Sequence, residues 1–182
     1  MKSKAPEEKY YAVQSERLTF RPFTESDIQL WVPFFVDNPT ERFLGSSHLK
    51  ISKEEKANNW IRRQIDRQNN GEFGQLAVIL KETNVLIGVG GIIQRELEGG
   101  KEFEITYSFL PEVWGNGYAT ELATFFKNYA FRELEPSSVI SIIHKENEAS
   151  MNVARKNGME ISSETTFMEM PVYIFRVQNP SL

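Results

Sequence analysis

The chain has 182 residues, of which 40% are hydrophobic and 25% charged, so it can form one domain with a sizeable core. Lys and Arg number 21 against 25 Asp and Glu, with no dense basic cluster, and nucleic acid is therefore not expected as a direct partner. The absence of cysteine excludes disulfides, thiolate zinc sites and a cysteine nucleophile.

No apolar run approaches the roughly 20 residues that span a bilayer, so no membrane contact is expected. The polar start "MKSKAPEEKY" also lacks the hydrophobic segment of a secretory signal. These features predict a cytoplasmic enzyme or binding domain. Residues 1–14 are expected to form a flexible N-terminal arm, and residues 15–182 a single domain, because no linker-like stretch divides them.

The first part of the domain is predicted to contain one strand and two helices. "SERLTFRPF" alternates apolar and polar residues and is typical of a first or edge strand. Thr24 is expected to cap a short helix that runs through Trp31. Turns follow, with a short helix around 40–44, and then Ser52 and Glu55 form a capping box for a helix that runs to about Gln68.

Three strand-like segments come next, "FGQLAVIL", "VLIGVGGIIQ" and "EFEITYSFL", joined by turn residues that predict an antiparallel meander. In the third, Phe103, Ile105, Tyr107 and Phe109 share one face, and Glu102, Glu104, Thr106 and Ser108 share the other. If this strand lies inside the sheet, its polar side must meet water, a cleft or a partner. Glu104 is therefore a candidate functional residue.

The last third is predicted to alternate helices and strands. A helix follows "WGNGYAT", with an apolar stripe at Leu122, Phe125, Phe126 and Tyr129. "SVISII" is expected to be a buried strand. A second helix spans about 147–157 and ends at Gly158, and "EISSETTFMEMPVYIFRV" gives two closing strands.

The two glycines of "WGNGYAT" raise the question of what that helix start holds. The first turn of a helix leaves backbone N–H groups unpaired at the positive end of its dipole, and glycine lets a ligand approach the backbone. The stretch is thus suited to a phosphate or pyrophosphate. The alternative is a strand-to-helix turn that needs glycine for its geometry alone. The segment matches neither the dinucleotide fingerprint nor a P-loop.

The order of these elements resembles the GNAT superfamily of N-acetyltransferases, whose pyrophosphate loop reads Q/R-x-x-G-x-G/A. Residues Trp114 to Ala119 occupy that motif. Trp114 departs from the leading Gln or Arg, but "WGxGYATE" is common in the branch that resembles ribosomal-protein N-terminal acetyltransferases. "ERLTFRP" and the spacing of Asn147, Ser150, Gly158 and Met159 also match this branch, so the resemblance covers about 15–178.

The resemblance implies an α+β fold with a mostly antiparallel, splayed sheet of about six to seven strands and helices on both faces. It also implies acetyl-CoA as cosubstrate, with the pantetheine arm between "EFEITYSFL" and "SVISII". The cofactor-binding residues implied are Phe109, Leu110, Trp114, Gly115, Asn116, Gly117, Tyr118, Ala119, Thr120, Asn147 and Ser150.

Acetyl transfer to an amine needs an uncharged nitrogen, a held carbonyl and a proton for the departing thiolate. Glu104 is the candidate base, with a solvated or salt-bridged carboxylate as the alternative. Ser150 is the candidate proton donor or bridge, and Asn147 could equally be a helix N-cap. Many superfamily members place a Tyr four residues after Ser150, where this chain has Ala154.

Other polar residues are expected to be structural. Glu102 and Glu121 are interpreted as structural carboxylates, and His48 and His144 as ordinary structural or surface residues. Because the two histidines and the scattered carboxylates lack ligand spacing, no metal is expected.

The sequence therefore predicts transfer of an acetyl group from acetyl-CoA to a primary amine by direct attack in a ternary complex. The acceptor is a protein N-terminus or an amine-bearing small molecule, recognised by residues 37–49 and the closing strands. Two alternatives remain, an antibiotic or metabolite N-acetyltransferase and a non-catalytic acyl-CoA-binding or sensing module. The acceptor's identity and the oligomeric state, including a homodimer, are left open.

Overall fold

The computed structural model describes residues 6–45, 50–97 and 99–181, and it shows a mixed α+β fold built on one seven-stranded sheet. The strand order is β1-β2-β3-β4-β5-β7-β6, and every neighbouring pair except β4–β5 is antiparallel. The strands are β1 Leu18–Arg21, β2 Gln75–Leu80, β3 Val85–Leu97, β4 Gly100–Phe109, β5 Ser138–His144, β6 Glu160–Phe167 and β7 Met170–Gln178. The predicted fold class and the meander are confirmed.

Among the residues that the structure describes, four α-helices cover the sheet, α1 Asp27–Trp31, α2 Lys53–Asn69, α3 Tyr118–Tyr129 and α4 Glu148–Lys156. Short helical turns occupy Glu8–Ala12, Val32–Phe35, Pro39–Phe43, Pro111–Val113 and Ala130–Leu134. None of the helices in the described ranges combines the length and apolarity needed to cross a membrane.

The predicted start of α2 is confirmed, whereas that of α1 differs. The Ser52 hydroxyl accepts a hydrogen bond from the Glu55 N–H at 3.1 Å, so Ser52 is the N-cap of α2. Before α1, Thr24 does not cap. Its N–H and hydroxyl both donate to the Asp27 carboxylate, which is buried and also binds Arg21. Residues 24–26 therefore form a turn, and the helix begins at Asp27.

The N-terminal segment contacts the domain through Tyr10, within the short helical turn Glu8–Ala12. Tyr10 is fully buried, and its hydroxyl donates to the Gly74 carbonyl at 2.8 Å and accepts from the Ile92 N–H at 2.9 Å. The ring also contacts Phe73 edge to face. No local pattern predicts this contact, since both hydrogen-bond partners lie more than 60 residues away. Residues 1–5 are outside the described ranges.

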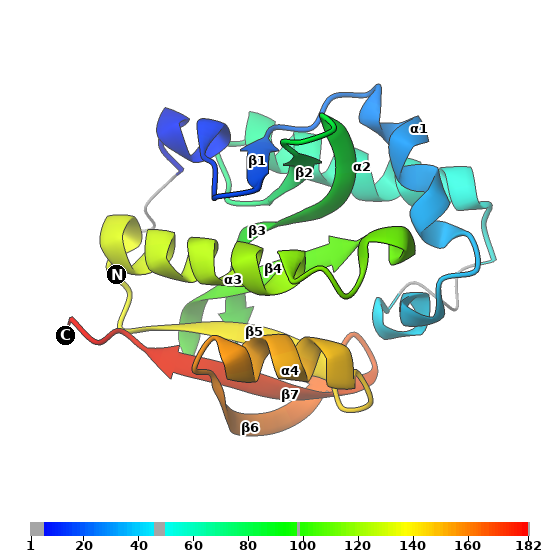
Figure 1. Ribbon diagram of the computed structural model, residues 1–182. Coiled ribbons are helices and arrows are strands. Elements are labelled where there is room, and N and C mark those ends of the chain that lie inside the picture. The colour runs from blue at the N-terminus through cyan, green and yellow to red at the C-terminus, as the bar shows by residue number, and fades with distance from the viewer. Residues whose placement is uncertain (1–5, 46–49, 98, 182) are drawn as a thin grey trace.

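The two faces of the sheet carry separate cores, which fixes the places of the helices (Figure 1). On one face, α3 and α4 bury Leu122, Phe126 and Met151 against strand residues that include Phe20 and Ile105. On the other face, α1, α2 and the turn after α1 bury residues that include Trp31, Phe34, Ile61, Ala77 and Val89. Successive residues of β4 therefore alternate between the α3–α4 face and the α2 face.

β4 and β5 meet at one point and then separate, as the resemblance predicted. Their parallel pairing has a single register position, Glu104 with Ile140. Next to it, the Ser141 hydroxyl donates to the Ile105 carbonyl at 2.9 Å. Beyond Ile105, β4 pairs only with β3, while β5 continues along β7. The sheet is thus split between Ile105 and Phe109.

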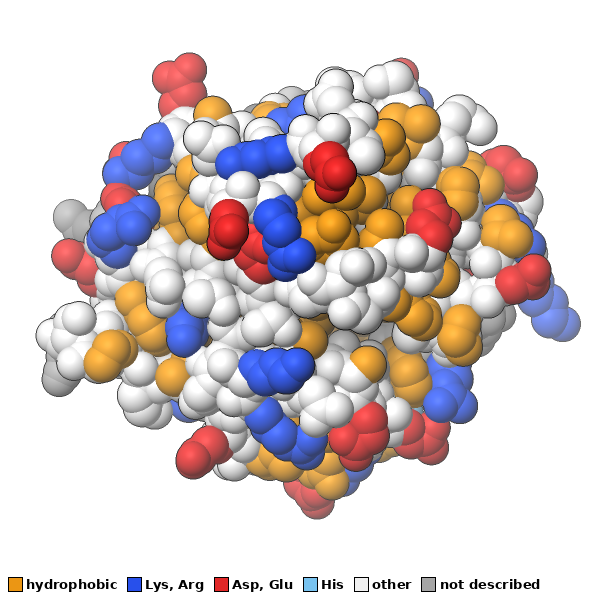
Figure 2. All heavy atoms as spheres, in the orientation of Figure 1, with side chains coloured by type: hydrophobic (Ala, Val, Ile, Leu, Met, Phe, Trp, Pro, Cys, Tyr) orange, Lys and Arg blue, Asp and Glu red, His pale blue; other side chains and the backbone are white. Residues whose placement is uncertain are grey.

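Charge is mixed on the face that α3 and α4 cover. Figure 2 shows Lys and Arg side chains interspersed with Asp and Glu side chains on this face. A nucleic-acid footprint requires basic side chains gathered along one surface. The side of the molecule drawn there has no such single-signed field.

Candidate active site

The loop before α3 presents an uncapped helix N-terminus. Gly115 and Gly117 have φ of +82° and +80°, a left-handed conformation that favours glycine. Gly117 is the N-cap residue, and no side chain caps this end. A Cβ added at Gly115 would meet no heavy atom within 4 Å, so the space before the first turn is open. The turn geometry accounts for these glycines, and the open space leaves room for an anion.

Arg17 holds this loop against the first strand. Its Nη1 donates to the Asn116 carbonyl at 3.0 Å, and its Nε donates to Glu121 Oε2 at 2.7 Å. The guanidinium lies 4.5 Å from the centre of the Tyr118 ring. Ser15 also donates to Glu121. Glu121 is therefore a structural carboxylate, as expected, and it places a positive group beside the start of α3.

Trp114 and Asn116 shape the loop through hydrogen bonds to its backbone. The Trp114 indole N–H donates to the Phe109 carbonyl at 2.8 Å, while the ring remains 43% exposed. The Asn116 amide donates to the carbonyls of Val113 and Trp114 at 3.0 and 3.3 Å. Trp114 stands where the general motif has Gln or Arg. Its physical role here is to donate a hydrogen bond to the last carbonyl of β4.

The open edge of β4 follows from its pairing with β3. The Leu110 N–H donates to the Ile87 carbonyl at 3.0 Å, so this is a hydrogen-bonded pair. Because such pairs alternate, the backbone groups of Ser108 also point to β3, and those of Tyr107 and Phe109 point to the split in the sheet. The Phe109 carbonyl is already bound by Trp114. The groups left for a ligand are the Phe109 N–H and both polar groups of Tyr107.

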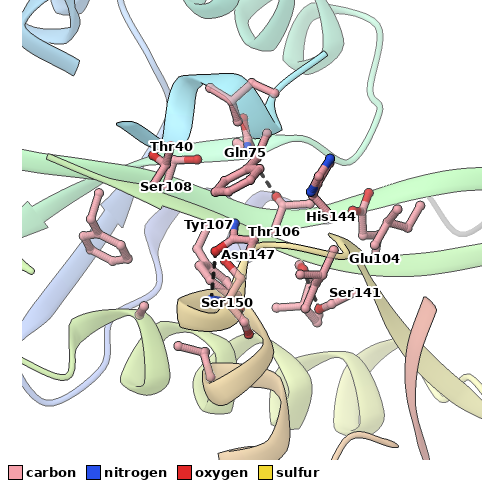
Figure 3. A pocket seen from close by; sticks show the side chains of 18 of the residues that line it. Thr40, Gln75, Glu104, Thr106, Tyr107, Ser108, Ser141, His144, Asn147 and Ser150 are labelled. Carbon is pink, nitrogen blue, oxygen red and sulfur yellow. Dashed lines mark hydrogen bonds between the residues drawn. The ribbon is translucent and has the colours of Figure 1, made fainter. Parts of the chain in front are cut away.

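A cavity of about 780 Å³ runs from the start of α3 through the split to the α2 face. Figure 3 shows side chains from β2, β4, β5 and α4 converging on it. Among the predicted site residues, those that line it are Glu104, Phe109, Trp114, Gly115, Gly117, Tyr118, Ala119, Thr120, Asn147 and Ser150. Leu110, which is 4% exposed, and Asn116 do not line it. The volume is that of a site for a small organic ligand.

Glu104 lies in this cavity on the α2 face and is buried, with 5% of its surface exposed. Arg95 Nε donates to Glu104 Oε2 at 2.5 Å. Burial raises the pKa of the Glu104 carboxyl above its usual value, although the charge and hydrogen bond of Arg95 oppose the rise. A raised pKa suits a group that must take up a proton near neutral pH. Glu104 is therefore salt-bridged to Arg95 and also lines the cavity.

The α4 end of the cavity contains Asn147, Ser150 and a phenol. Asn147 Oδ1 accepts from the Ser150 N–H at 3.1 Å, so Asn147 caps α4 and also lines the cavity. The Tyr107 hydroxyl donates to the Ser150 carbonyl at 3.1 Å. Burial raises the pKa of Tyr107, which keeps it a proton-bearing donor. Ala154 is buried in the core. Sequence reasoning missed Tyr107, because its alternation with Ile105 and Phe109 is typical of core.

Three further residues were expected to be structural. Glu102 pairs with Arg176 through two hydrogen bonds of 2.8 and 3.1 Å, which agrees with the expectation. His144 lines the cavity, lies 4.9 Å from Phe43 between ring centres and accepts the Glu146 N–H on Nδ1. His48 falls outside the described residues. Within the described part of the chain, no three His, Cys, Asp or Glu side chains form a metal-binding group.

A chain of polar side chains connects α2 to β4 across the cavity wall. The Trp60 indole donates to Gln75 Oε1 at 2.7 Å, and the Gln75 amide donates to the Thr106 hydroxyl at 3.2 Å. The Gln75 N–H also donates to Gln64 Oε1 at 3.0 Å. These bonds fix the cavity-facing side of α2 relative to the strand that carries Glu104.

Residues 17–160 match the family model described as acetyltransferase (GNAT) domain, which covers most of the chain. The chain belongs to the GNAT acetyltransferase family and is an acetyltransferase. The Bacillus subtilis protein YkkB, itself uncharacterised, is 34% identical over 52% of this chain and 55% of its own length. The uncharacterised N-acetyltransferase YoaA of the same organism is 24% identical over 81% of this chain and 82% of its own.

Solved structures share this fold at low sequence identity. A GNAT-family acetyltransferase from Bacillus anthracis superposes with a TM-score of 0.75, 22% identity and coverage of 92% of this chain and 98% of its own. RimL, a ribosomal L7/L12 α-N-protein acetyltransferase solved in complex with coenzyme A, gives a TM-score of 0.70, 16% identity and coverage of 90% and 95%.

Proposed function

We propose that the chain transfers an acetyl group from acetyl-CoA to a primary amine, either a protein N-terminal α-amine or a small-molecule amine. The observation that carries this proposal is the single cavity that joins an uncapped helix N-terminus to a buried carboxylate through the split in the sheet. The family uses acetyl-CoA, and the residues here fit it. Open space and unpaired first-turn N–H groups suit a diphosphate, and the free edge of β4 suits the amides of a pantetheine arm.

The chemistry needs no covalent intermediate with the protein. Glu104 takes a proton from the acceptor amine, directly or through water, and the neutral nitrogen attacks the thioester carbonyl. As the carbon–sulfur bond breaks, the attacking nitrogen loses its extra proton to water. The thiolate takes a proton from a donor at the α4 end of the cavity, and solvent then reprotonates that donor. Ser150 and the Tyr107 hydroxyl are the two donors there. Holding both reactants in one cavity supplies the main rate advantage, because it makes attack unimolecular.

Purified protein mixed with acetyl-CoA and a panel of amines and N-terminal peptides tests the proposal. Transfer is expected to release free thiol and to add an acetyl mass to the acceptor. Coenzyme binding without transfer to any amine in the panel would instead support a non-catalytic acyl-CoA sensor, which the sequence left open.

A further inference from the structure

One side of α2 places charged residues along the cavity. Ala57 and Ile61 pack into the core on one side of this helix. The neighbouring side lines the cavity at helical spacing, through Lys56, Asn59, Trp60, Arg63, Gln64 and Arg67. Arg95 of β3 lines the same part of the cavity beside Glu104. We call Arg63, Arg67 and Arg95 the cationic wall.

Positive charge exceeds negative charge in the described lining of the cavity. Its cationic side chains are Lys56, Arg63, Arg67, Arg95 and Lys156, and its carboxylate is Glu104 alone. Lys56 pairs with Glu41, which lies outside the lining, and Arg95 pairs with Glu104. Arg63 and Arg67 have no ion pair within the described part of the chain. Two positive charges of the cationic wall therefore form no salt bridge, although the charges of Glu72 and Glu104 also act on Arg67.

The arginines are held near one another. Arg67 is half-buried, and its Nη1 donates to the Phe73 carbonyl at 3.3 Å. Burial, together with the charges of Arg95 and Arg63, lowers the pKa of Arg67. The hydrogen bond from the Gln75 N–H to Gln64 holds α2 in place, so a shift of this helix does not move the arginines apart. Like charges fixed beside a cavity are stabilised when an anion binds between them.

We propose that the cationic wall binds an anionic group of the acceptor, a carboxylate or phosphate, while the acceptor's amine reaches Glu104. This inference rests on the proposed function and names its substrate class. Guanidinium groups present donors in a planar fork that matches such anions, and Arg95 uses one of its donors on Glu104. The anion therefore binds next to the reacting amine. Acid-bearing amines are the preferred acceptors, whether small amino acids or peptide N-termini with an acidic residue close to the α-amine.

Matched acceptors test the proposal directly. The C-terminally amidated peptides Ser-Glu-Ala-NH2 and Ser-Gln-Ala-NH2 differ only in one carboxylate, and glycine and glycinamide form the small-molecule pair. We expect kcat/KM to favour the acidic member by about tenfold, the effect of one charge-assisted hydrogen bond. The pair with the larger preference identifies the source of the amine. The preference should shrink with added salt, because charges in an open cavity are screened.

Variants assign the preference to the wall. Arg67→Gln and Arg63→Gln should each raise KM for the acidic acceptor, with kcat and the rate on the neutral acceptor little changed. Arg63 is exposed, so its variant keeps the fold even if Arg67→Gln does not. Arg62→Gln is the control, because Arg62 pairs with Asn58 on the same helix and with Glu25 in the turn before α1, and it does not line the cavity.

Three outcomes would overturn the inference. The first is equal rates on the acidic and neutral members of both pairs. The second is a preference that survives in the Arg63→Gln, Arg67→Gln double variant. The third is faster acetylation of the polyamine spermidine than of any acidic acceptor. Each of these still shows acetyl transfer, so the proposed function stands, whereas failure to acetylate every amine overturns both.

Discussion

Replacing Glu104 by Gln tests the assignment of the base with little change to the structure. The side chain is 5% exposed and lines the cavity, and Gln has nearly the same shape. The amide oxygen can still accept the hydrogen bond of Arg95. The change therefore removes proton uptake and leaves packing intact. General-base catalysis contributes about 10²- to 10⁴-fold, so we expect kcat to fall at least 100-fold, or about 3 kcal/mol in activation free energy.

The pH profile gives a second, independent measurement. Because burial raises the pKa of Glu104, its basic form appears at a higher pH than that of an ordinary carboxylate. In the wild type, log kcat should rise with pH through that raised value, and in Glu104→Gln this limb should be absent. Stability has the matching sign. Because the pKa of Glu104 is higher in the folded than in the unfolded protein, its protonated form stabilises the fold at pH values below the unfolded pKa. This stabilisation is lost as the pH rises through the folded pKa. At pH 7, Glu104→Gln should therefore unfold at a urea concentration no lower than that of the wild type.

The assay is steady-state release of free thiol at saturating acetyl-CoA, with one acceptor across the pH range. Glu102→Gln is the matched control, since Glu102 lies two residues earlier on the same face of β4 but pairs with Arg176 outside the cavity lining. The control should keep wild-type kcat. Unchanged kcat in Glu104→Gln, with the same pH limb as the wild type, would refute the assignment.

Three further changes test other parts of the structure. Ala119→Asp puts a carboxylate in the first turn of α3, which should stabilise the helix by about 0.5 kcal/mol. Because this carboxylate repels the diphosphate, the affinity for coenzyme A measured by calorimetry should fall more than tenfold, and Ala119→Ser is the control. Tyr107→Phe and Ser150→Ala should each lower kcat without raising KM for the acceptor, and the larger loss identifies the main proton donor for the thiolate. Asp27→Asn should cost about 2 kcal/mol at pH 7 in urea unfolding. Burial alone would raise the pKa of Asp27, but Arg21 and Thr24 outweigh it and lower the pKa, so this stability is present above pH ~4 and lost as the pH falls through the lowered value.

The features predicted from the sequence are those set by neighbouring residues. Ser52 caps α2 because its partner N–H lies three residues along the chain. The glycine loop has a positive φ at both predicted glycines, which local turn geometry requires. The place of Glu104 followed from alternation along one strand, since the polar face of β4 does border a cavity.

The features that were missed depend on contacts distant in sequence. Tyr10 hydrogen-bonds to Gly74 and Ile92, which lie 64 and 82 residues away, so its segment looked unstructured. The ion pair of Arg95 with Glu104 depends on the register of the β3–β4 hairpin, which turn residues alone do not set. Arg63 and Arg67 have the spacing of any solvated helix face, and only the split in the sheet turns that face toward a cavity.

The single joint between β4 and β5 also affects how the molecule responds to its coenzyme. One register position and the Ser141 hydroxyl connect a four-stranded half-sheet to a three-stranded one. A pantetheine arm paired with Tyr107 and Phe109 would act as a removable extra strand that braces the two halves. Amide hydrogen exchange at these two residues should therefore slow on adding coenzyme A, and the melting temperature should rise with coenzyme concentration.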